Sequence, residues 1–323
     1  MIRSYRRETG RLQPVYGAPD PLDSLVWIDL ISPTDEEENS LEARLGIDLP
    51  TKADMEEIEV SSRLYQNNGA VFMTAVIPAH ADGGDPQVAP VTFILAGERL
   101  ITVRYHEPRA FQTFSARVQK AASGCETGAG VLVALLETIV DRLADILERT
   151  GRDVDRLSRT VFKRGGAKPT PARDFQTVLE EIGRGGDQTS NIRDSLVTLE
   201  RMAGYLAQVI MHSKVPDDVQ EGIKTLSRDV HSLSDHSGFL NQKITFLLDA
   251  TLGMISIEQN AIIKIFSVVA VVFLPPTLIA SVYGMNFRFM PELEWLLGYP
   301  FALGLMLAAA ILPYLFFKHR GWL

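Results

Sequence analysis

Two long apolar segments lie near the end of the chain, at residues 262–282 and 296–317. At about 1.5 Å per residue, each is long enough to cross a hydrocarbon core roughly 30 Å thick as a helix. The second segment contains no charged residue and the first contains only Lys264, whereas buried helices of soluble proteins seldom run this long without charge. The pattern predicts two membrane-spanning helices, with residues 285–295 as an external loop between them.

Before position 109 the apolar pattern is that of strands. Short segments rich in β-branched and aromatic residues occur in LVWIDL, RLYQNNGAVFMTAVIPA and VTFILAGERLITVRY, and NNG and AGER supply hairpin turn signals. Between the first two lie TDEEENSLEARLG and PTKADMEEIE, in which a Thr or Asp start signal precedes acidic residues, as is typical of helix N-termini. We predict an α+β cytosolic domain with a mixed sheet over residues 1–108.

From about Ala110 onward, apolar residues recur every three or four positions, which predicts helices. Residues 109–216 form a predicted cytosolic helical region with a turn at KRGGAKPTPA, which lacks the GxxxxGK[ST] spacing of a phosphate loop. Residues 217–284 contain no proline between Asp217 and Pro275 and keep helical spacing into the first span. An unbroken helix of that length measures roughly 100 Å. Because a lone amphipathic rod cannot bury its own apolar stripe, we predict an oligomer with its symmetry axis along these helices.

The overall composition hides the membrane part, because 46% hydrophobic residues and a mean hydropathy of +0.05 are ordinary for a soluble protein. Of the 40 acidic and 32 basic residues, two and four follow position 260, which leaves 38 and 28 before it and a net charge of −10. Such an acidic domain argues against nucleic acid as a partner and favours cations. The sequence contains no motif that indicates an enzyme, and a single Cys125 excludes an internal disulfide.

The opening segment MIRSYRRETG has charge but lacks the apolar region of a signal peptide, so we expect the large domain to remain in the cytosol. Two spans return the chain to the same side. There the basic tail, residues 318–323, together with Lys264 outweighs Arg288 of the external loop, as the positive-inside rule requires. We therefore expect a multi-pass protein of the inner (plasma) membrane with both termini in the cytosol.

The loop between the spans follows YGMN, residues 283–286. A glycine where a helix stops, followed by Asn286, would offer an amide oxygen to the axis of an oligomer. Several such amides would form a ring of neutral oxygen dipoles, which suits a hard cation such as Mg²⁺ held through its water shell. Glu292 and Glu294 at the same mouth would raise the local cation concentration. The alternative is a helix C-cap followed by solvated charges.

The YGMN motif, followed by MPEL at residues 290–293, resembles the signature of the CorA magnesium channel family, whose members carry a GMN triplet at the end of the first of two C-terminal spans. The similarity continues in LLDATLGMISIEQNAIIKIF, in the basic tail and, more loosely, in IEVSSRLYQNNGAVFMTAVIPA. The resemblance implies a homopentameric funnel in the lipid bilayer, with a stalk helix that continues into the pore and a second span packed outside it. It also implies that hydrated Mg²⁺ moves into the cytosol, that Mg²⁺ is the regulatory ion as well, and that no organic cofactor is needed.

By this resemblance, Gly284, Met285 and Asn286 would form the outer selectivity ring. Seven residues at three- and four-residue steps on one face of the first span would line the pore: Asn260, Ile263, Phe266, Ala270, Leu274, Thr277 and Ser281. The apolar members of this line would close the pore by dewetting. The sequence departs from the family here, since relatives often have methionine or leucine at positions 263 and 266, and a single proline where this chain has Pro275 and Pro276.

The family closes when cytosolic Mg²⁺ binds carboxylates between subunits. The nearest counterparts in this chain are Asp229, Asp82 and Asp85, and simple solvation is the alternative for each, since Mg²⁺ needs only one or two carboxylates and keeps its waters. His231 and His236 are five residues apart, so they do not share a helix face as zinc ligands at i and i+4 would.

Two other functions remain open at this point. One is transport of Zn²⁺, Co²⁺ or Ni²⁺ within the same superfamily; relatives with that role tend to have isoleucine in the middle of the triplet, and Met285 argues against it. The other is a membrane-anchored sensor or scaffold. A sensor of that kind would need a ligand-binding domain between its spans, and the loop of residues 285–295 is too short for one.

Overall fold

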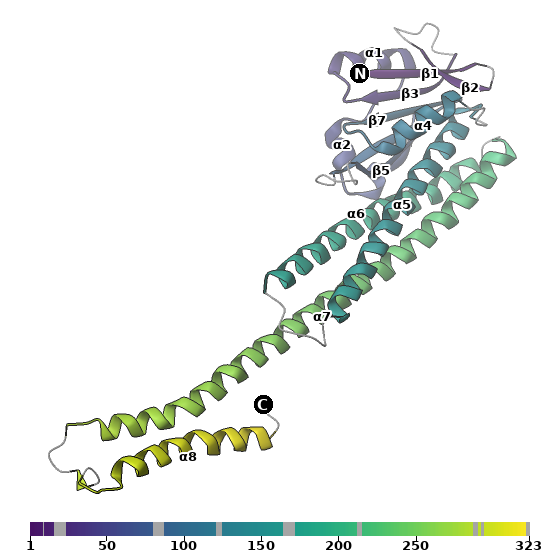
Figure 1. Cartoon of the computed structure of the whole chain (residues 1–323). Helices are drawn as coiled ribbons and strands as arrows, with labels where there is room; N and C mark the ends of the chain where they lie inside the picture. Colours follow the sequence, from purple (N-terminus) through teal and green to yellow (C-terminus); the bar gives the residue numbers. More distant parts are fainter. Residues whose placement is uncertain are drawn as a thin grey trace. The chain divides into compact units, whose positions relative to one another are not determined.

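Two compact units make up the chain in the computed structural model, which describes residues 1–8, 10–15, 24–79, 87–120, 125–163, 172–211, 215–286, 290–291 and 294–320. The first unit consists of Met1–Phe162 and Thr177–Leu247, and the second of Lys163–Gln176 and Leu248–Leu323. The division at Leu247 falls inside the long helix α7 (Asp217–Tyr283), which is labelled in Figure 1. The chain therefore passes from one unit to the other without a linker at that point.

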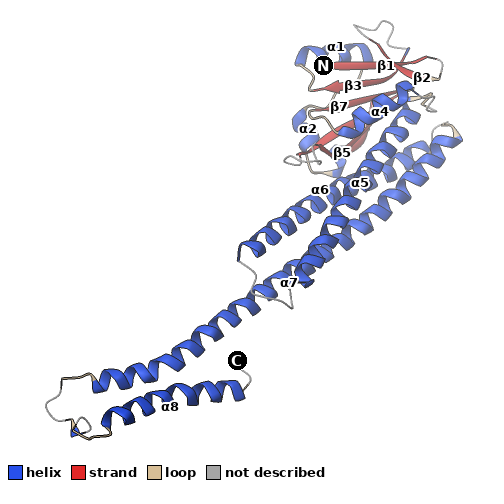
Figure 2. Ribbon diagram, viewed as in Figure 1, coloured by secondary structure: helices blue, strands red, loops and turns tan. Residues whose placement is uncertain are grey.

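A seven-stranded mixed sheet forms the N-terminal part of the first unit (Figure 2). Its strands follow the spatial order β2, β1, β3, β7, β6, β5, β4. Strands β3 and β7 are parallel, and all other neighbouring pairs are antiparallel. The bounds are β1 Ile2–Glu8, β2 Arg11–Val15, β3 Leu25–Ile31, β4 Leu64–Asn67, β5 Ala70–Ala79, β6 Gln87–Ala96 and β7 Arg99–Arg104. The mixed sheet expected from the strand pattern is confirmed.

Both predicted hairpin turns are present. Asn68 and Gly69 have φ values of 48° and 78° and join β4 to β5, which matches the left-handed backbone that an Asn-Gly hairpin turn requires. Gly97, with φ 59°, turns the chain between β6 and β7. A side chain other than glycine at position 97 would strain this turn, because L-residues rarely adopt that backbone conformation.

The sequence pattern does not predict the hairpin of β1 and β2, because charge dominates the opening segment. Its alternation is weak: Tyr5 and Leu12 are buried, whereas the three residues that end β1 are exposed. Strand β1 nevertheless occupies an inner position, paired with β2 on one side and β3 on the other. A strand that is half buried and half charged resembles a surface segment when its partners are unknown.

The helices on one face of the sheet begin where the sequence predicts. Thr34 starts α1 (Asp35–Leu45) and Thr51 starts α2 (Lys52–Glu56), each through a complete capping box with the residue three positions later. In the first box, the Thr34 hydroxyl accepts from the Glu37 N–H at 3.3 Å and the Glu37 carboxylate accepts from the Thr34 N–H at 3.1 Å. Such caps satisfy backbone donors that a helix start otherwise leaves without a partner. The short helix α3 (Val60–Arg63) follows.

Side chains alternate between two cores on opposite faces of the sheet. Ile28 and Phe72 belong to the smaller core, together with residues of α1 and α2. Trp27 and Met73, their neighbours in sequence, belong to the larger core. A strand places successive side chains on opposite faces, so each of these two strands contributes to both cores.

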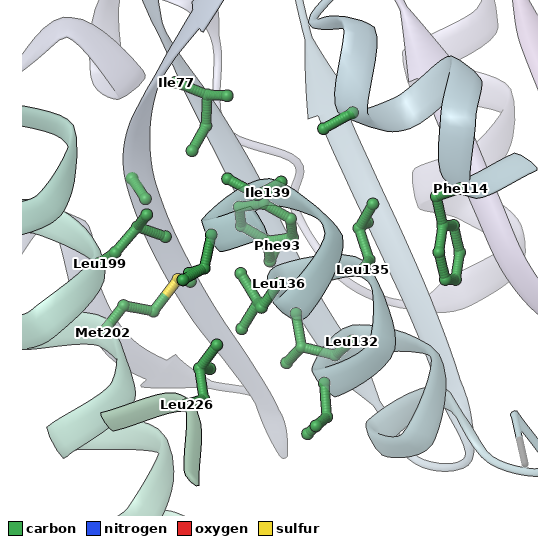
Figure 3. Close-up of a cluster of buried hydrophobic side chains, with 14 of the residues drawn as sticks. Ile77, Phe93, Phe114, Leu132, Leu135, Leu136, Ile139, Leu199, Met202 and Leu226 are labelled. Carbon is green, nitrogen blue, oxygen red and sulfur yellow. The ribbon is translucent and has the colours of Figure 1, made fainter. Parts of the chain in front are cut away.

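The larger core joins the sheet to four helices, α4 (Arg109–Lys120), α5 (Gly128–Lys163), α6 (Ala172–Ile210) and α7. Figure 3 shows its centre, where Leu136 and Ile139 of α5 lie near Phe93 of β6, with Met202 of α6 and Leu226 of α7 beside them. All five side chains are at most 3% exposed. The sheet and the parts of these four helices that contribute to the larger core therefore share one hydrophobic core.

A buried ion pair ties together the two parallel strands at the middle of the sheet. Asp29 of β3 accepts from Arg104 of β7 through both carboxylate oxygens, at 3.0 and 2.9 Å, and also from the Thr102 hydroxyl at 2.8 Å. Both charged side chains are 2% exposed. Arg104 donates a further hydrogen bond to the His106 carbonyl and stacks over Phe111. Every charge in this cluster is paired, which is the condition for burying charge in a protein core.

The second unit contains the end of α7 and the helix α8 (Gly298–His319). Helix α7 runs unbroken through Pro275 and Pro276. The fold class predicted from the sequence is confirmed: an α+β domain, a long helix and two apolar C-terminal helices.

Candidate pore and metal sites

The apolar part of α7 and helix α8 are both long and apolar enough to cross a membrane. In the most apolar stretch of α7 no residue is buried by the rest of the chain, and in that of α8 only 6% are. An apolar helix of a soluble core would be covered by its own chain. The exposure therefore indicates that lipid or other subunits cover these helices.

The seven predicted pore residues share one face of α7. At about 100° per residue, positions 260 to 281 in the predicted set fall within an arc of about 120°. All seven side chains are exposed, including Ile263 at 61%, Phe266 at 70% and Leu274 at 66%. None of the residues that the structure describes covers this face, which leaves it free to border a pore or another copy.

The half-buried positions of the span lie on the other side of the helix. They are Val268, Val271, Val272, Pro275, Pro276, Ile279 and Tyr283. Helix α8 is the other long element of the same unit. This face of α7 therefore packs within its own subunit, opposite the predicted pore face.

The proline pair falls on this packed face. Proline at 275 and 276 removes the backbone donors that would bind the carbonyls of Val271 and Val272 four residues earlier. Both valines are half-buried. One turn away, the Thr277 hydroxyl donates to the Phe273 carbonyl at 2.6 Å. Prolines are tolerated in spanning helices where neighbouring groups satisfy the freed carbonyls, and the packed face provides such neighbours.

Helix α7 ends at Tyr283, immediately before the GMN triplet. The Gly284 N–H donates to the Ala280 carbonyl at 2.9 Å and the Met285 N–H to the Val282 carbonyl at 3.3 Å. Gly284 does not adopt the left-handed conformation of a common helix cap, but an added Cβ would lie only 3.1 Å from the Ala280 oxygen. Tight space against the last turn, rather than a left-handed backbone, therefore explains the glycine.

The rest of the predicted outer mouth is partly described. Asn286 is exposed directly after the last turn, and Glu294 is exposed before α8. Glu292 lies outside the described residues. The amide ring itself requires several copies, so it stays a prediction.

Of the predicted regulatory carboxylates, Asp229 is exposed on α7, and Asp82 and Asp85 lie outside the described residues. Asp229 is close enough to influence Glu137 of α5, which the sequence did not single out. Desolvation raises the pKa of Glu137 above its usual value, and the charges of Asp141 and Asp229 raise it further against the opposing effect of Arg117. Within the described ranges, no three His, Cys, Asp or Glu side chains are grouped so as to hold a metal ion.

The two histidines have separate surroundings. The His231 ring lies 3.0 Å from Glu200 of α6 through Nδ1 and 3.8 Å from Asp235 through Nε2. The hydrogen bond to Glu200, and then the charge of Asp235, raise the pKa of His231. His236 stacks against Phe239, with 6.4 Å between ring centroids. His231 therefore bridges α6 and α7 as an ionic contact on the surface of the bundle.

Comparison with known proteins decides the family. The family model described as CorA-like Mg²⁺ transporter protein matches residues 23–319. The chain belongs to this family. Its relatives include magnesium transport proteins CorA from Haemophilus influenzae (strain ATCC 51907), 36% identical over 323 residues, and from Pasteurella multocida (strain Pm70), 37% identical over 324 residues, each with 100% of both chains covered.

Among solved structures, the complete CorA magnesium transporter from Methanocaldococcus jannaschii has a TM-score of 0.71 at 18% identity, covering 100% of this chain and 99% of that one. This likeness shows the fold from the first strand to the last helix. As a CorA-family protein, the chain is a membrane transporter and not an enzyme. The resemblance to the CorA family that the YGMN motif indicates is confirmed.

Proposed function

We propose that five copies of this chain form a channel through which hydrated Mg²⁺ enters the cytosol. The observation that carries the proposal is the uncovered face of α7, which leads along one continuous helix to the exposed Asn286. A helix face that its own chain leaves bare over a whole span needs a border of water, lipid or other subunits. The magnesium transport proteins that match the full chain support water and Mg²⁺ at this face.

The outer ring would select by hydration rather than by charge. Gly284, Met285 and Asn286 contribute one neutral side-chain oxygen per subunit. Mg²⁺ dehydrates reluctantly, so five amide oxygens would hold it through its waters and still release it. Glu292 and Glu294 at the mouth would concentrate cations without entering the ring.

The line inside the span would act as the gate. Its apolar members Ile263, Phe266 and Leu274 follow one another, with the polar Asn260 before them and the polar Thr277 and Ser281 after them. A narrow apolar stretch of this kind closes by losing its water, without any moving plug. Opening would then require only that the five helices move apart slightly at these positions.

Cytosolic Mg²⁺ would act on the closed state through carboxylates of the soluble unit, of which Asp229, Asp82 and Asp85 are the candidates. A ligand that binds one state more tightly shifts the population toward it. Mg²⁺ bound between subunits would hold the soluble units together and keep the pore narrow. The protein would lie in the inner membrane, with both termini in the cytosol.

Uptake by liposomes tests the transport proposal. Wild-type protein and Asn286→Ala are reconstituted side by side, and Mg²⁺, Co²⁺, Ni²⁺ and Zn²⁺ are offered in separate runs. We expect Mg²⁺ uptake by the wild type and its loss in the variant, with native mass spectrometry giving pentamers for both. Wild-type uptake of Zn²⁺ without Mg²⁺ would refute the ion assignment, and Mg²⁺ uptake at the wild-type rate by Asn286→Ala would refute the selectivity ring.

A further inference from the structure

An open groove lies between α6 and α7 on the surface of the first unit. Its volume is about 910 Å³, close to the upper end of the range of small-molecule sites, roughly 300–1,000 Å³. The described residues that line it all belong to these two helices and to the first unit. None of the residues assigned above to the pore, the selectivity ring or the regulatory carboxylates is among them.

The wall supplied by α7 separates positive from negative charge. Lys224, Arg228, His231 and Asp235 follow one another at steps of four, three and four residues, so they share one face of the helix. Lys224 and Asp235 are eleven residues apart, which is about 16 Å along the helix. The groove therefore has a basic end and an acidic end.

The floor of the basic end is apolar. Helices α6 and α7 follow each other along the chain and run in opposite directions (Figure 1). Glu200 of α6 contacts His231 of α7, so Ala207, seven residues later on α6, lies level with Lys224, seven residues earlier on α7. Ala207 is half-buried and Ile223 is 2% exposed. Both line the groove and offer a surface on which a carbon skeleton can pack.

The basic end has no counter-charge from this chain, as far as the structure describes it. The Arg228 guanidinium donates to the Lys224 carbonyl at 3.4 Å and to the Thr225 hydroxyl at 3.2 Å, both on its own helix. Among the described residues, neither Lys224 nor Arg228 is paired with a carboxylate. The Ser227 hydroxyl lines the groove beside them. Guanidinium, ammonium and hydroxyl donors around open space are the groups that bind phosphate.

The acidic end offers acceptors. Glu200 binds the His231 ring through Oε1 at 3.0 Å, and Asp235 lies 3.8 Å from the other ring nitrogen. In the part of the chain that the structure describes, Glu200 Oε2 and the Asp235 carboxylate accept no hydrogen bond. Ionised carboxylates accept from hydroxyl and amino groups. An inorganic phosphate would use only the basic end, so the groove suits a longer ligand that also carries donors.

We propose that this groove binds an organic phosphate whose organic part carries hydroxyl or amino donors, the chemical class to which nucleotides belong. Lys224 and Arg228 hold the phosphate, and Glu200 and Asp235 accept from the organic part. The net charge of −10 before position 261 repels anions from most of the soluble surface, so binding depends on these local groups. The proposal stands apart from Mg²⁺ transport, because no residue of the pore takes part.

Calorimetric titration of the full-length protein in nanodiscs of zwitterionic lipid tests the site. ATP, inorganic triphosphate and adenosine are titrated separately at about 0.15 M salt, which screens long-range attraction. EDTA is present, so that Mg²⁺ does not bridge a nucleotide to a carboxylate. We expect ATP to bind once per subunit. Triphosphate and adenosine should each bind at least about tenfold more weakly, because each reaches only one end of the groove.

Variants assign the two ends. Lys224→Gln together with Arg228→Gln should weaken ATP binding at least about tenfold, because charge-assisted hydrogen bonds to phosphate are lost. The matched control is Arg159→Gln together with Arg193→Gln, which removes the same charge from exposed positions outside the groove and should change the Kd by less than about twofold. Glu200→Gln should weaken ATP about fivefold and leave triphosphate binding unchanged.

Three results would overturn the proposal. The first is no binding of ATP by the wild type at about 1 mM, a concentration that corresponds to very weak affinity. The second is equal weakening by the groove pair and the control pair, which would assign binding to the overall charge. The third is triphosphate binding as tight as that of ATP, which would leave the acidic end without a role. A failure of Mg²⁺ transport would appear in the liposome assay instead and would not alter these titrations.

Discussion

The buried pair of Asp29 and Arg104 allows a quantitative test of how the soluble unit is held together. Asp29→Asn preserves the shape of the side chain but removes its charge and places an NH₂ group where a carboxylate oxygen accepts from Arg104. The guanidinium, 2% exposed, would then be buried without a counter-charge. Breaking a buried ion pair in this way costs about 3–5 kcal/mol.

That loss corresponds to a fall in Tm of roughly 6–20 °C for a unit of this size, at about 2–4 °C per kcal/mol. Thermal unfolding of the purified full-length protein, followed by circular dichroism at fixed Mg²⁺, measures it. Arg7→Gln is the matched control, because its ion pair with Glu126 is exposed on both sides and should contribute about 0–1 kcal/mol.

The double variant Asp29→Leu with Arg104→Met completes the test. It removes both charges together, and replacing a buried pair with apolar side chains of similar volume is often neutral. We expect it to recover at least half of the lost Tm. The lost hydrogen bonds from Arg104 to the His106 carbonyl and from the Thr102 hydroxyl to Asp29 account for the remainder. The reasoning is refuted if Asp29→Asn shifts Tm no more than Arg7→Gln, or if the double variant is as unstable as the single one.

Three further predictions concern charge. Asn286→Asp should leave slow transport with altered ion preference, because like charges around the proposed ring raise some carboxylate pKa values and hold divalent ions too tightly. Wild-type rates and a wild-type ion ranking in a competition experiment with liposomes would contradict this. Because the pKa of Glu137 is raised in the folded protein, its contribution to stability is greatest below the ordinary carboxyl pKa and is lost as pH rises through the raised value. Glu137→Gln should therefore have a higher Tm than the wild type at pH 7 and no such advantage at pH 4, and equal Tm values at both pH values would contradict this. Because the pKa of His231 is raised in the folded protein, its pairing with Glu200 stabilises the fold below about pH 6.5, and this contribution is lost as pH rises through the raised pKa. His231→Ala should therefore lower Tm at pH 5.5 but not at pH 8.5, and thermal unfolding at both pH values measures this.

Local sequence signals predict much of the fold directly. Thr34 and Thr51 mark helix starts because a capping box lies within four residues, and Asn68 with Gly69 marks a hairpin because only a few residue types adopt that backbone. The two spans are equally local, since length and absence of charge suffice.

Features that depend on distant partners could not be predicted in the same way. Strand β1 is an inner strand only because β3 pairs with it, and its exposed end conceals the alternation. Asp29 and Arg104 are 75 positions apart, and no local sequence pattern predicts that they form an ion pair. Glu137 becomes notable only once α5 lies against α7. The proposed regulatory carboxylates would meet only between copies, on surfaces that a single sequence does not pair.

The continuity of α7 limits how this protein can change length. Helix α7 runs from Asp217 to Tyr283 without interruption, so an inserted residue rotates and advances every residue that follows it along the helix. One residue inserted between positions 248 and 258 would turn every residue after it by about 100° and advance it by about 1.5 Å, so the proposed pore face with Asn260 and Leu274 would turn away by the same angle. Seven inserted residues would restore the phase to within about 20° while adding about 10 Å. Stalks of this design can therefore lengthen or shorten only in steps close to whole numbers of turns.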